Sequence, residues 1–260
     1  MNETPQEPVT LFLTREEVVV LLEELNGGQI NVLRREAMPE WNRSQQEAAL
    51  SAASNGLVAR RLLAPSFVEE DRVNPLAAAA VAASVSNDAS LLITTRRPGE
   101  APVIANHYRQ GDLQVSRLPS HDNLNMFVLV NAETDRVAWL GTALGLDEAG
   151  EAASGESVKV SSEKFARLLD SLTEDKPQQV LTSDDSIDVG SNQDLTEFLA
   201  SQPTIATITS IAESADELRT ITILGADGKF WLGTAEDGEA VILSPATSTD
   251  ILSQVDRLLD

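Results

Sequence analysis

The side chains that most often carry out chemistry are scarce in this sequence. It contains no cysteine and two histidines, His107 and His121. Without cysteine there is no thiol nucleophile, disulfide, iron–sulfur cluster or thiolate zinc site. His107 falls in an expected strand and His121 in an expected loop, and neither forms a helical metal-ligand pair of the HExxH kind. A single strand histidine is more often packed or exposed than catalytic, so we assign no catalytic residue.

Motifs that bind phosphates, nucleotides or calcium are also missing. The sequence has no GxSxG, GxxxxGK[ST] or GxGxxG run. The segment 184–197 resembles a calcium loop in composition, but a loop starting at Asp185 places Ile187 and Val189 at ligand positions and Thr196 at the last one. Aliphatic side chains cannot coordinate calcium, so the EF-hand register fails. We therefore predict no metal site and no cofactor.

Carboxylates are plentiful, because 41 of the 260 residues are Asp or Glu. At that density, two acids close together in sequence carry almost no information. A small-molecule hydrolase whose carboxylates converge stays an alternative, since two carboxylates suffice for glycoside hydrolysis. Sugar sites usually also use aromatic platforms, and the chain has only six Phe, three Trp and one Tyr. We therefore favour a protein that is not an enzyme.

The net charge of −22 restricts the partners. An acidic surface repels phosphate backbones and anionic lipids, and no basic patch offsets it, so we expect no binding to nucleic acid or membranes. Residues 1–143 hold 18 acids and 12 bases (net −6), whereas residues 144–260 hold 23 and 7 (net −16). The acidic half is either a solvated face or a surface for a partner protein with a basic surface.

Three helices are expected before any strand. Thr14 and Glu17 form a capping box, and Gly27 with Gly28 ends the first helix. A second helix is expected from Ser44, with Glu47 three residues on, to Asn55 and Gly56. Asn74 and Pro75 are typical of the start of a third helix, which continues to about Val85.

From Ser90 onward the hydrophobic period changes from that of a helix to that of a strand, and short connections favour antiparallel pairs. The segment 147–156 has the composition of an exposed loop, and the acidic segment 173–191 that of a linker. The expected strands are 90–96, 102–109, 113–118, 126–132, 136–143, 157–160, 204–212, 218–225, 229–235 and 240–244, and the expected helices are 162–172, 193–201 and 249–259.

The pentapeptide WLGTA occurs twice, at Trp139–Ala143 and at Trp231–Ala235. Each copy follows a β-branched strand and a turn, and precedes an acidic loop, another strand and an amphipathic helix. This order indicates two related units, 92 residues apart. The alternative is that these are unrelated edge strands of similar composition. In either case we expect Trp139 and Trp231 to be core anchors.

These observations predict an α+β fold with antiparallel sheets, flanking helices and two quasi-repeated halves. The expected division is a disordered N-terminus at 1–10, a helical start with a first sheet-and-helix unit at 11–172, the linker 173–191, and a second, related unit at 192–260. The segment Met1–Val9 has no features of a signal peptide, and the apolar run Leu76–Val85 is about half the roughly 20 residues needed to cross a bilayer. We expect a cytoplasmic protein.

The order of elements resembles the EspG family, the cytosolic chaperones of type VII (ESX) secretion. The similar strings are LTREEVVVLLEEL, SAASNGL, VNPLAAAAVAASV, SLLITTRR and VIANHYRQGDLQVSRLP, which span roughly residues 11–130. The resemblance implies a mixed α/β fold with two quasi-equivalent halves around an antiparallel sheet, and binding of secretion substrates without catalysis. The chain differs from the family by its acidic loop 147–156 and by a short turn at Arg97–Glu100. We carry over no binding residue, and expect a non-enzymatic, chaperone-like adaptor.

Overall fold

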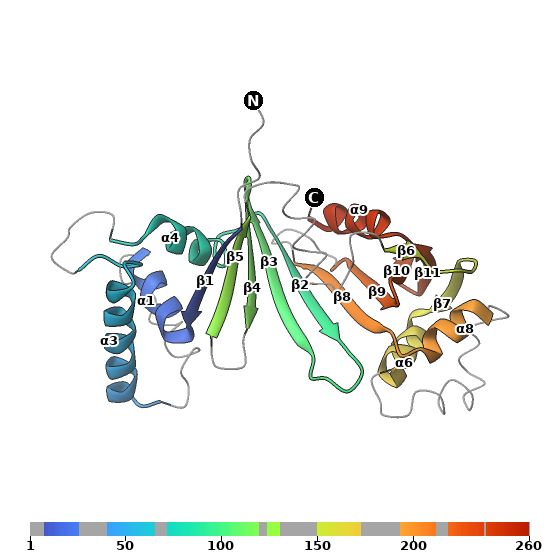
Figure 1. The fold of residues 1–260 in the computed structure, drawn as a ribbon, viewed down its shortest axis with the longest axis horizontal. Helices are drawn as coiled ribbons and strands as arrows, with labels where there is room; N and C mark the ends of the chain where they lie inside the picture. The colour runs from blue at the N-terminus through green and yellow to red at the C-terminus, as the bar shows by residue number, and fades with distance from the viewer. Residues whose placement is uncertain are drawn as a thin grey trace. The chain divides into compact units, whose positions relative to one another are not determined.

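A computed structural model describes residues 8–25, 41–65, 72–119, 124–130, 150–172, 193–211, 218–236 and 238–259. It shows an α+β fold whose long strands pair antiparallel, as predicted (Figure 1). The chain divides into two compact units, each built from two stretches of sequence. Unit 1 comprises Met1–Asp88 and His107–Ala132, and unit 2 comprises Ala89–Asn106 and Glu133–Asp260.

Unit 1 packs helices on one face of a small antiparallel sheet. Its elements are β1 (Val9–Thr14), α1 (Arg15–Leu25), α3 (Arg43–Ala59), α4 (Pro75–Ala82), β4 (Leu113–Pro119) and β5 (Leu124–Val130), and β3 (Val103–Gln110) enters it at His107. The strand order is β1-β5-β4-β3. The core between sheet and helices includes Leu13, Leu21, Leu57 and Phe127, each with no exposed surface.

The start of the chain differs from the expectation of three helices before any strand. β1 comes first and pairs with β5 in the register Leu11↔Phe127. Residues 9 and 10, which we expected in a disordered N-terminus, belong to this strand. The capping box of α1 is confirmed, since the Glu17 N–H donates to Thr14 Oγ1 over 3.2 Å and the Thr14 N–H donates to Glu17 Oε2 over 2.9 Å.

The second and third helices also differ in their ends. The capping box of α3 is formed by Asn42 and Gln45 rather than by Ser44 and Glu47. The helix runs through Gly56 to Ala59, because this glycine allows close packing against α1 and does not end the helix. α4 begins at the predicted Asn74 cap, whose Oδ1 accepts the Leu76 N–H, but ends at Ala82.

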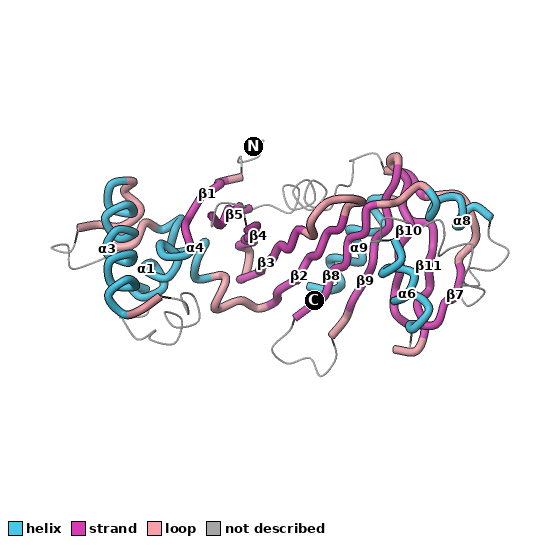
Figure 2. The backbone as a smooth tube through the Cα atoms, turned by 90° about the horizontal axis from the view of Figure 1, so that it is seen from below, coloured by secondary structure: helices cyan, strands magenta, loops and turns pink. Residues whose placement is uncertain are grey.

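Unit 2 is a larger sheet with helices on both faces. Its elements are β2 (Ala89–Arg96), β6 (Glu151–Ala152), β7 (Val158–Ser161), α6 (Ser162–Leu172), α8 (Gln193–Ala200), β8 (Thr204–Ile211), β9 (Thr220–Ala226), β10 (Lys229–Glu236), β11 (Ala240–Ala246) and α9 (Ser248–Leu259). The strand order β2-β8-β9-β10-β11-β7 can be followed in Figure 2.

The two faces of the unit 2 sheet carry different helices (Figure 1). α6 and α8 cover the face that holds Ile205, Leu224 and Trp231. α9 covers the other face, where Ser210 Oγ donates to the Leu258 carbonyl over 2.8 Å. Trp231 is fully buried, as expected of a core anchor. No helix in the part of the chain described is both long and apolar enough to cross a membrane.

The segment 151–156 is exposed except at Ala153, as its composition indicated, but it is not all loop. Glu151 and Ala152 form β6, a short strand parallel to β10, and Ala153 is buried. Gly150 makes this possible, because a Cβ atom there would lie 2.0 Å from the Phe230 ring. The Gly150 carbonyl also accepts the Ser248 N–H at the start of α9.

The strand and helix at 158–172 pack with the C-terminal strands. We expected them to close the first sheet-and-helix unit. Instead β7 pairs with β11, and α6 contributes Phe165 and Leu168 to the same core as Trp231. The linker 173–191, the strand 136–143 and Trp139 lie outside the described residues. The internal repeat therefore stays a prediction, and so does the boundary at the linker.

Candidate functional site

Of the two histidines, His107 lies among the described residues, on β3, and is 1% exposed. Its Nδ1 atom is 2.8 Å from Ser116 Oγ on β4, and Ser116 has no exposed surface. A nucleophile and base at this distance could carry out acyl transfer only if a substrate could reach them. Because both side chains are buried in the sheet, this pair serves packing. His121 lies outside the described residues.

A chain of polar side chains crosses the core face of unit 1. Arg117 Nε donates to Asn125 Oδ1 over 2.9 Å, and Asn125 Nδ2 reaches the Leu13 carbonyl over 3.4 Å. Burial raises the pKa of Tyr108, while the charge and hydrogen bond of Arg117 oppose that rise. The contacts join β3, β4, β5 and β1, so these polar groups hold the strands in register, and none of them lines the two cavities described below.

No group of three or more His, Asp or Glu side chains in the described ranges is arranged to hold a metal ion. Two cavities lie in unit 2, and each is lined by a single carboxylate, Glu100 in one and Asp227 in the other. Neither of them brings two carboxylates together, so the hydrolase alternative finds no support there.

The cavity at the β2–β3 turn has a mixed lining. Its volume is about 260 Å³, and three prolines, Leu172 and Ile205 supply the apolar part of its wall. Arg96, Arg97 and Glu100 supply the charges, and Arg97 Nη1 lies 3.6 Å from Glu100 Oε2. The prolines are Pro98, Pro102 and Pro203.

The turn itself is the one that the sequence predicted. The Glu100 N–H donates to the Arg97 carbonyl over 3.1 Å, and Gly99 adopts a positive φ of 73°. Such a φ favours glycine, because a Cβ atom would crowd the backbone. The turn is thereby fixed in shape, and its prolines have little conformational freedom to lose when a partner binds.

Large apolar side chains are exposed next to this cavity. Val103 is 43% exposed and Ile104 47% exposed, and the two are successive residues at the start of β3. Because neighbouring strand residues point to opposite faces, the hairpin presents an apolar side chain on each side. Adjacent exposed apolar groups beside a cavity with charged walls are typical of a protein-binding surface.

The other cavity is larger, at about 410 Å³, but mostly polar. It lies where β8, β9 and β10 begin or end, beside Ser201, Thr204 and Asp227. None of the exposed large apolar side chains in the described ranges directly follows its lining in sequence, as Val103 follows Pro102 at the turn cavity. The turn cavity is therefore the better candidate for contact with another protein.

Sequence reasoning found only the turn at Arg97–Glu100. Leu172 ends α6 and Pro203 precedes β8, so they reach this cavity from far along the chain. No local pattern marks them as neighbours of the turn. In the sequence Val103 and Ile104 are typical strand residues. Their exposure depends on which distant segments pack against them, and the local sequence does not indicate this.

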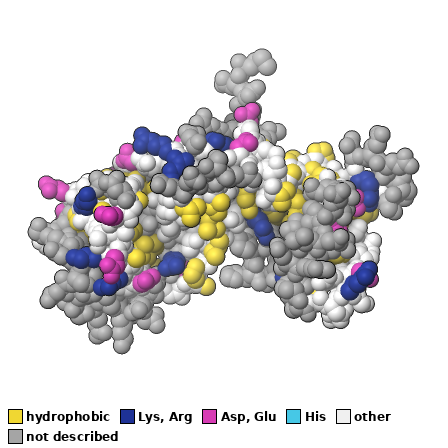
Figure 3. All heavy atoms as spheres, turned by 180° about the vertical axis from the view of Figure 1, so that it is seen from behind, with side chains coloured by type: hydrophobic (Ala, Val, Ile, Leu, Met, Phe, Trp, Pro, Cys, Tyr) yellow, Lys and Arg dark blue, Asp and Glu magenta, His cyan; other side chains and the backbone are white. Residues whose placement is uncertain are grey.

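Acidic and basic side chains are mixed on the face of the molecule drawn in Figure 3, among the residues that are coloured. Several of the described pairs are local, such as Arg43 with Glu47 and Arg167 with Glu163. At the turn cavity two arginines, Arg96 and Arg97, line the wall with one carboxylate, Glu100, so these side chains leave an excess of positive charge in a strongly acidic chain.

The fold is similar to that of a solved secretion chaperone. The matching structure is of another protein, the Mycobacterium tuberculosis type VII secretion system chaperone EspG5 in complex with the PE25–PPE41 dimer. The TM-score is 0.58 at 14% sequence identity, and the match covers 97% of this chain and 96% of that chain. The resemblance to the EspG family is thus confirmed at the level of the fold. No protein-family model matches the sequence, and no curated protein is similar to it in sequence.

Proposed function

We propose that this protein is a cytoplasmic chaperone or adaptor that binds a secretion substrate through the β2–β3 turn of unit 2. The observation that carries the proposal is the match, over nearly the whole of both chains, to a chaperone that was solved with a bound protein dimer. The scarcity of catalytic residues and the absence of paired carboxylates in the two cavities agree with binding without catalysis.

The partner would contact Val103, Ile104 and the turn cavity. Apolar side chains of the partner would cover Val103 and Ile104, which gain most from leaving water. Arg96 and Arg97 would bind carboxylate or carbonyl groups of the partner at the mouth of the cavity. Outside this contact, the net charge of −22 favours a partner with a basic surface.

The test is co-purification with PE–PPE dimers, beginning with PE25–PPE41 and continuing with any such pair found encoded near this chain's gene. We expect one of these dimers to co-elute with the chain in size-exclusion chromatography. Val103→Asp with Ile104→Asp should abolish co-elution, because two charges would be desolvated at the contact.

The control is Val85→Asp, which adds a charge at a site that is 52% exposed and lies outside the turn. Binding should survive this change. If the Val103/Ile104 variant binds as tightly as the unaltered chain, the site is wrong. If none of the dimers binds, the proposed class of substrate is wrong.

A further inference from the structure

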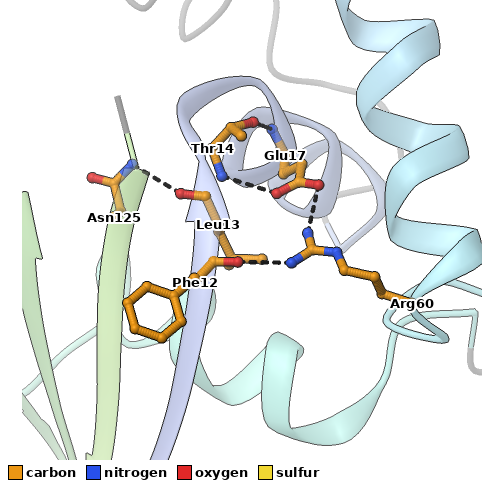
Figure 4. A network of polar contacts seen from close by, with 6 residues as sticks. All are labelled: Phe12, Leu13, Thr14, Glu17, Arg60 and Asn125. Carbon is orange, nitrogen blue, oxygen red and sulfur yellow. Dashed lines mark hydrogen bonds and ion pairs between the residues drawn. The ribbon is translucent and has the colours of Figure 1, made fainter. Parts of the chain in front are cut away.

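The outer edge of β1 ends the sheet of unit 1. β1 pairs with β5 on one side, and no strand of the described ranges pairs with its other side. Backbone groups alternate in direction along a strand, so Thr10, Phe12 and Thr14 point their N–H and C=O groups away from β5. Two contacts confirm this direction, since Arg60 and Glu17 reach Phe12 and Thr14 from outside (Figure 4).

Arg60 forms a hydrogen bond with the Phe12 carbonyl at the centre of that edge. Its Nη1 donates to the Phe12 carbonyl over 2.8 Å, while its Nη2 forms an ion pair with Glu17 Oε1. The side chain of Glu17 is 9% exposed, and its Oε2 accepts the Thr14 N–H. Gly56 leaves room for this pair, because a Cβ atom there would lie 3.3 Å from Glu17 Oε1. The guanidinium is thus held in place by a buried carboxylate.

Among the described residues, no further hydrogen bond is found at the outward backbone groups of Thr10 and Phe12. Both residues are also exposed, Phe12 to 50%. An antiparallel pair of two such edges, centred on Leu11, would match Thr10 of one copy with Phe12 of the other. In that pairing the Thr10 N–H must donate to the Phe12 carbonyl, twice by symmetry. That carbonyl is the acceptor already held by Arg60.

We propose that Arg60, positioned by Glu17, closes the outer edge of β1 against pairing with the same strand of a second copy of this chain. Exposed edges are templates for strand addition, and proteins commonly block them with charged side chains. Here the block is a direct hydrogen bond to the acceptor that self-pairing needs. Removing it exposes a self-complementary edge at residues 10–12.

The test compares apparent masses in sedimentation velocity over a range of concentrations. The starting variant is Glu17→Gln, whose single amide oxygen keeps the capping-box hydrogen bond to the Thr14 N–H but removes the ion pair that positions Arg60. Adding Arg60→Ala opens the edge without leaving a buried, unpaired carboxylate. Adding Thr10→Pro to that pair removes the outward N–H while sparing the ladder with β5. Arg43→Ala controls for the loss of one exposed positive charge in α3.

We expect Arg43→Ala to sediment as the unaltered protein does, and Glu17→Gln to shift less than the open-edge variant, because its Arg60 can still donate to the Phe12 carbonyl without the ion pair. Glu17→Gln with Arg60→Ala should shift with concentration toward twice that mass, and more so in ~1 M sodium chloride, where a Debye length of about 3 Å screens repulsion between acidic copies. Thr10→Pro should reverse the shift. An open-edge variant that is folded by circular dichroism and sediments as the unaltered protein overturns the proposal, and so does association that persists with Thr10→Pro.

Discussion

Gly56 lies in the middle of α3, where a glycine normally lowers helix stability. Replacing a helical glycine with alanine usually stabilises by about 1 kcal/mol. At Gly56 the added Cβ would lie 3.3 Å from Oε1 of the Glu17 carboxylate, which Arg60 and the Thr14 N–H hold in place. We therefore expect Gly56→Ala to give no such gain, and to lower the free energy of unfolding in urea.

A double-mutant cycle isolates the cause. In a Glu17→Ala background the carboxylate is gone, so Gly56→Ala should then recover the usual gain of about 1 kcal/mol. Equal effects of Gly56→Ala in both backgrounds would show that Glu17 does not set the space at this position.

Thr247 and Asp250 form the N-terminal cap of α9. Asp250 Oδ2 accepts from the Thr247 N–H over 2.9 Å and from the Thr247 hydroxyl over 2.7 Å, and these hydrogen bonds lower the pKa of Asp250. We expect Thr247→Ala to cost about 0.5–2 kcal/mol of unfolding free energy at neutral pH.

The pH dependence follows from the direction of the shift. The pKa of Asp250 is lower in the folded protein than in the unfolded chain, where it is about 3.9. The ionised carboxylate therefore stabilises the fold fully above a pH of about 3.9, and this stabilisation is lost as the pH falls through the folded pKa. We expect Asp250→Asn to melt at a lower temperature than the unaltered protein at pH 7, and at the same temperature near pH 2. A gap in melting temperature that is unchanged by acid would rule out ionised Asp250 as its source.

Two of the three expected helix caps in the first part of the chain were predicted correctly, the cap of α3 being the exception, whereas contacts between distant residues could not be predicted. Thr14 with Glu17 and the Asn74 cap are visible in the sequence because each involves residues within three positions. Arg60 reaches Phe12 across 48 positions, and no pattern in either segment marks the contact. The role of Gly56 was misread for the same reason, since its neighbour belongs to another helix.

At the scale of elements, the packing of β6 on β10 depends on Gly150. Its missing side chain leaves the space that the Phe230 ring occupies, and its carbonyl accepts the first N–H of α9. We expect Gly150→Ala to lower the unfolding free energy by about 1–3 kcal/mol, the usual cost of overpacking. The measurement is urea denaturation followed by tryptophan fluorescence.

Ser154→Ala is the control, because Ser154 is exposed in the same segment. That change should stay within about 0.5 kcal/mol of the unaltered protein. Comparable losses in the two variants would mean that the segment, rather than the Gly150 contact, is sensitive to substitution.

Hairpins were the elements easiest to predict. β2, β3 and β4 are joined by turns with Pro and Gly, and β2 alternates in burial, so their ends fall within a residue or so of the expected ones. β1 was missed because its partner β5 lies more than a hundred positions away. β6 was missed because its two residues sit in a segment whose acidic composition is typical of a loop. The candidate site combines a turn that the sequence predicts with lining residues from α6 and β8 that it does not predict.

At the scale of the whole molecule, net charge should set the response to salt. Twenty-two excess negative charges repel one another more in the folded chain than in the expanded one. The exposed pairs Arg43–Glu47 and Arg167–Glu163 offset little of this, because exposed ion pairs contribute about 0–1 kcal/mol.

We therefore expect the melting temperature to rise between ~0.1 M and ~1 M sodium chloride, as the Debye length falls from about 10 Å to about 3 Å. Differential scanning calorimetry is the measurement. A lower melting temperature in high salt would mean that favourable pairs outweigh repulsion. The full chain is the right sample, because a cut between residues 143 and 144 would separate β2 from β8.

The pairing of β2 with β8 also constrains how the protein is made. Ser90 Oγ donates to the Ile211 carbonyl across 121 positions of sequence. At a synthesis rate of roughly 5–20 residues per second, β2 leaves the ribosome many seconds before β8 exists. During that interval its β8-facing edge can pair with other chains. Ribosome stalling or premature termination before residue 204 should therefore yield products that aggregate, and expression should be most sensitive to codon choice between β2 and β8.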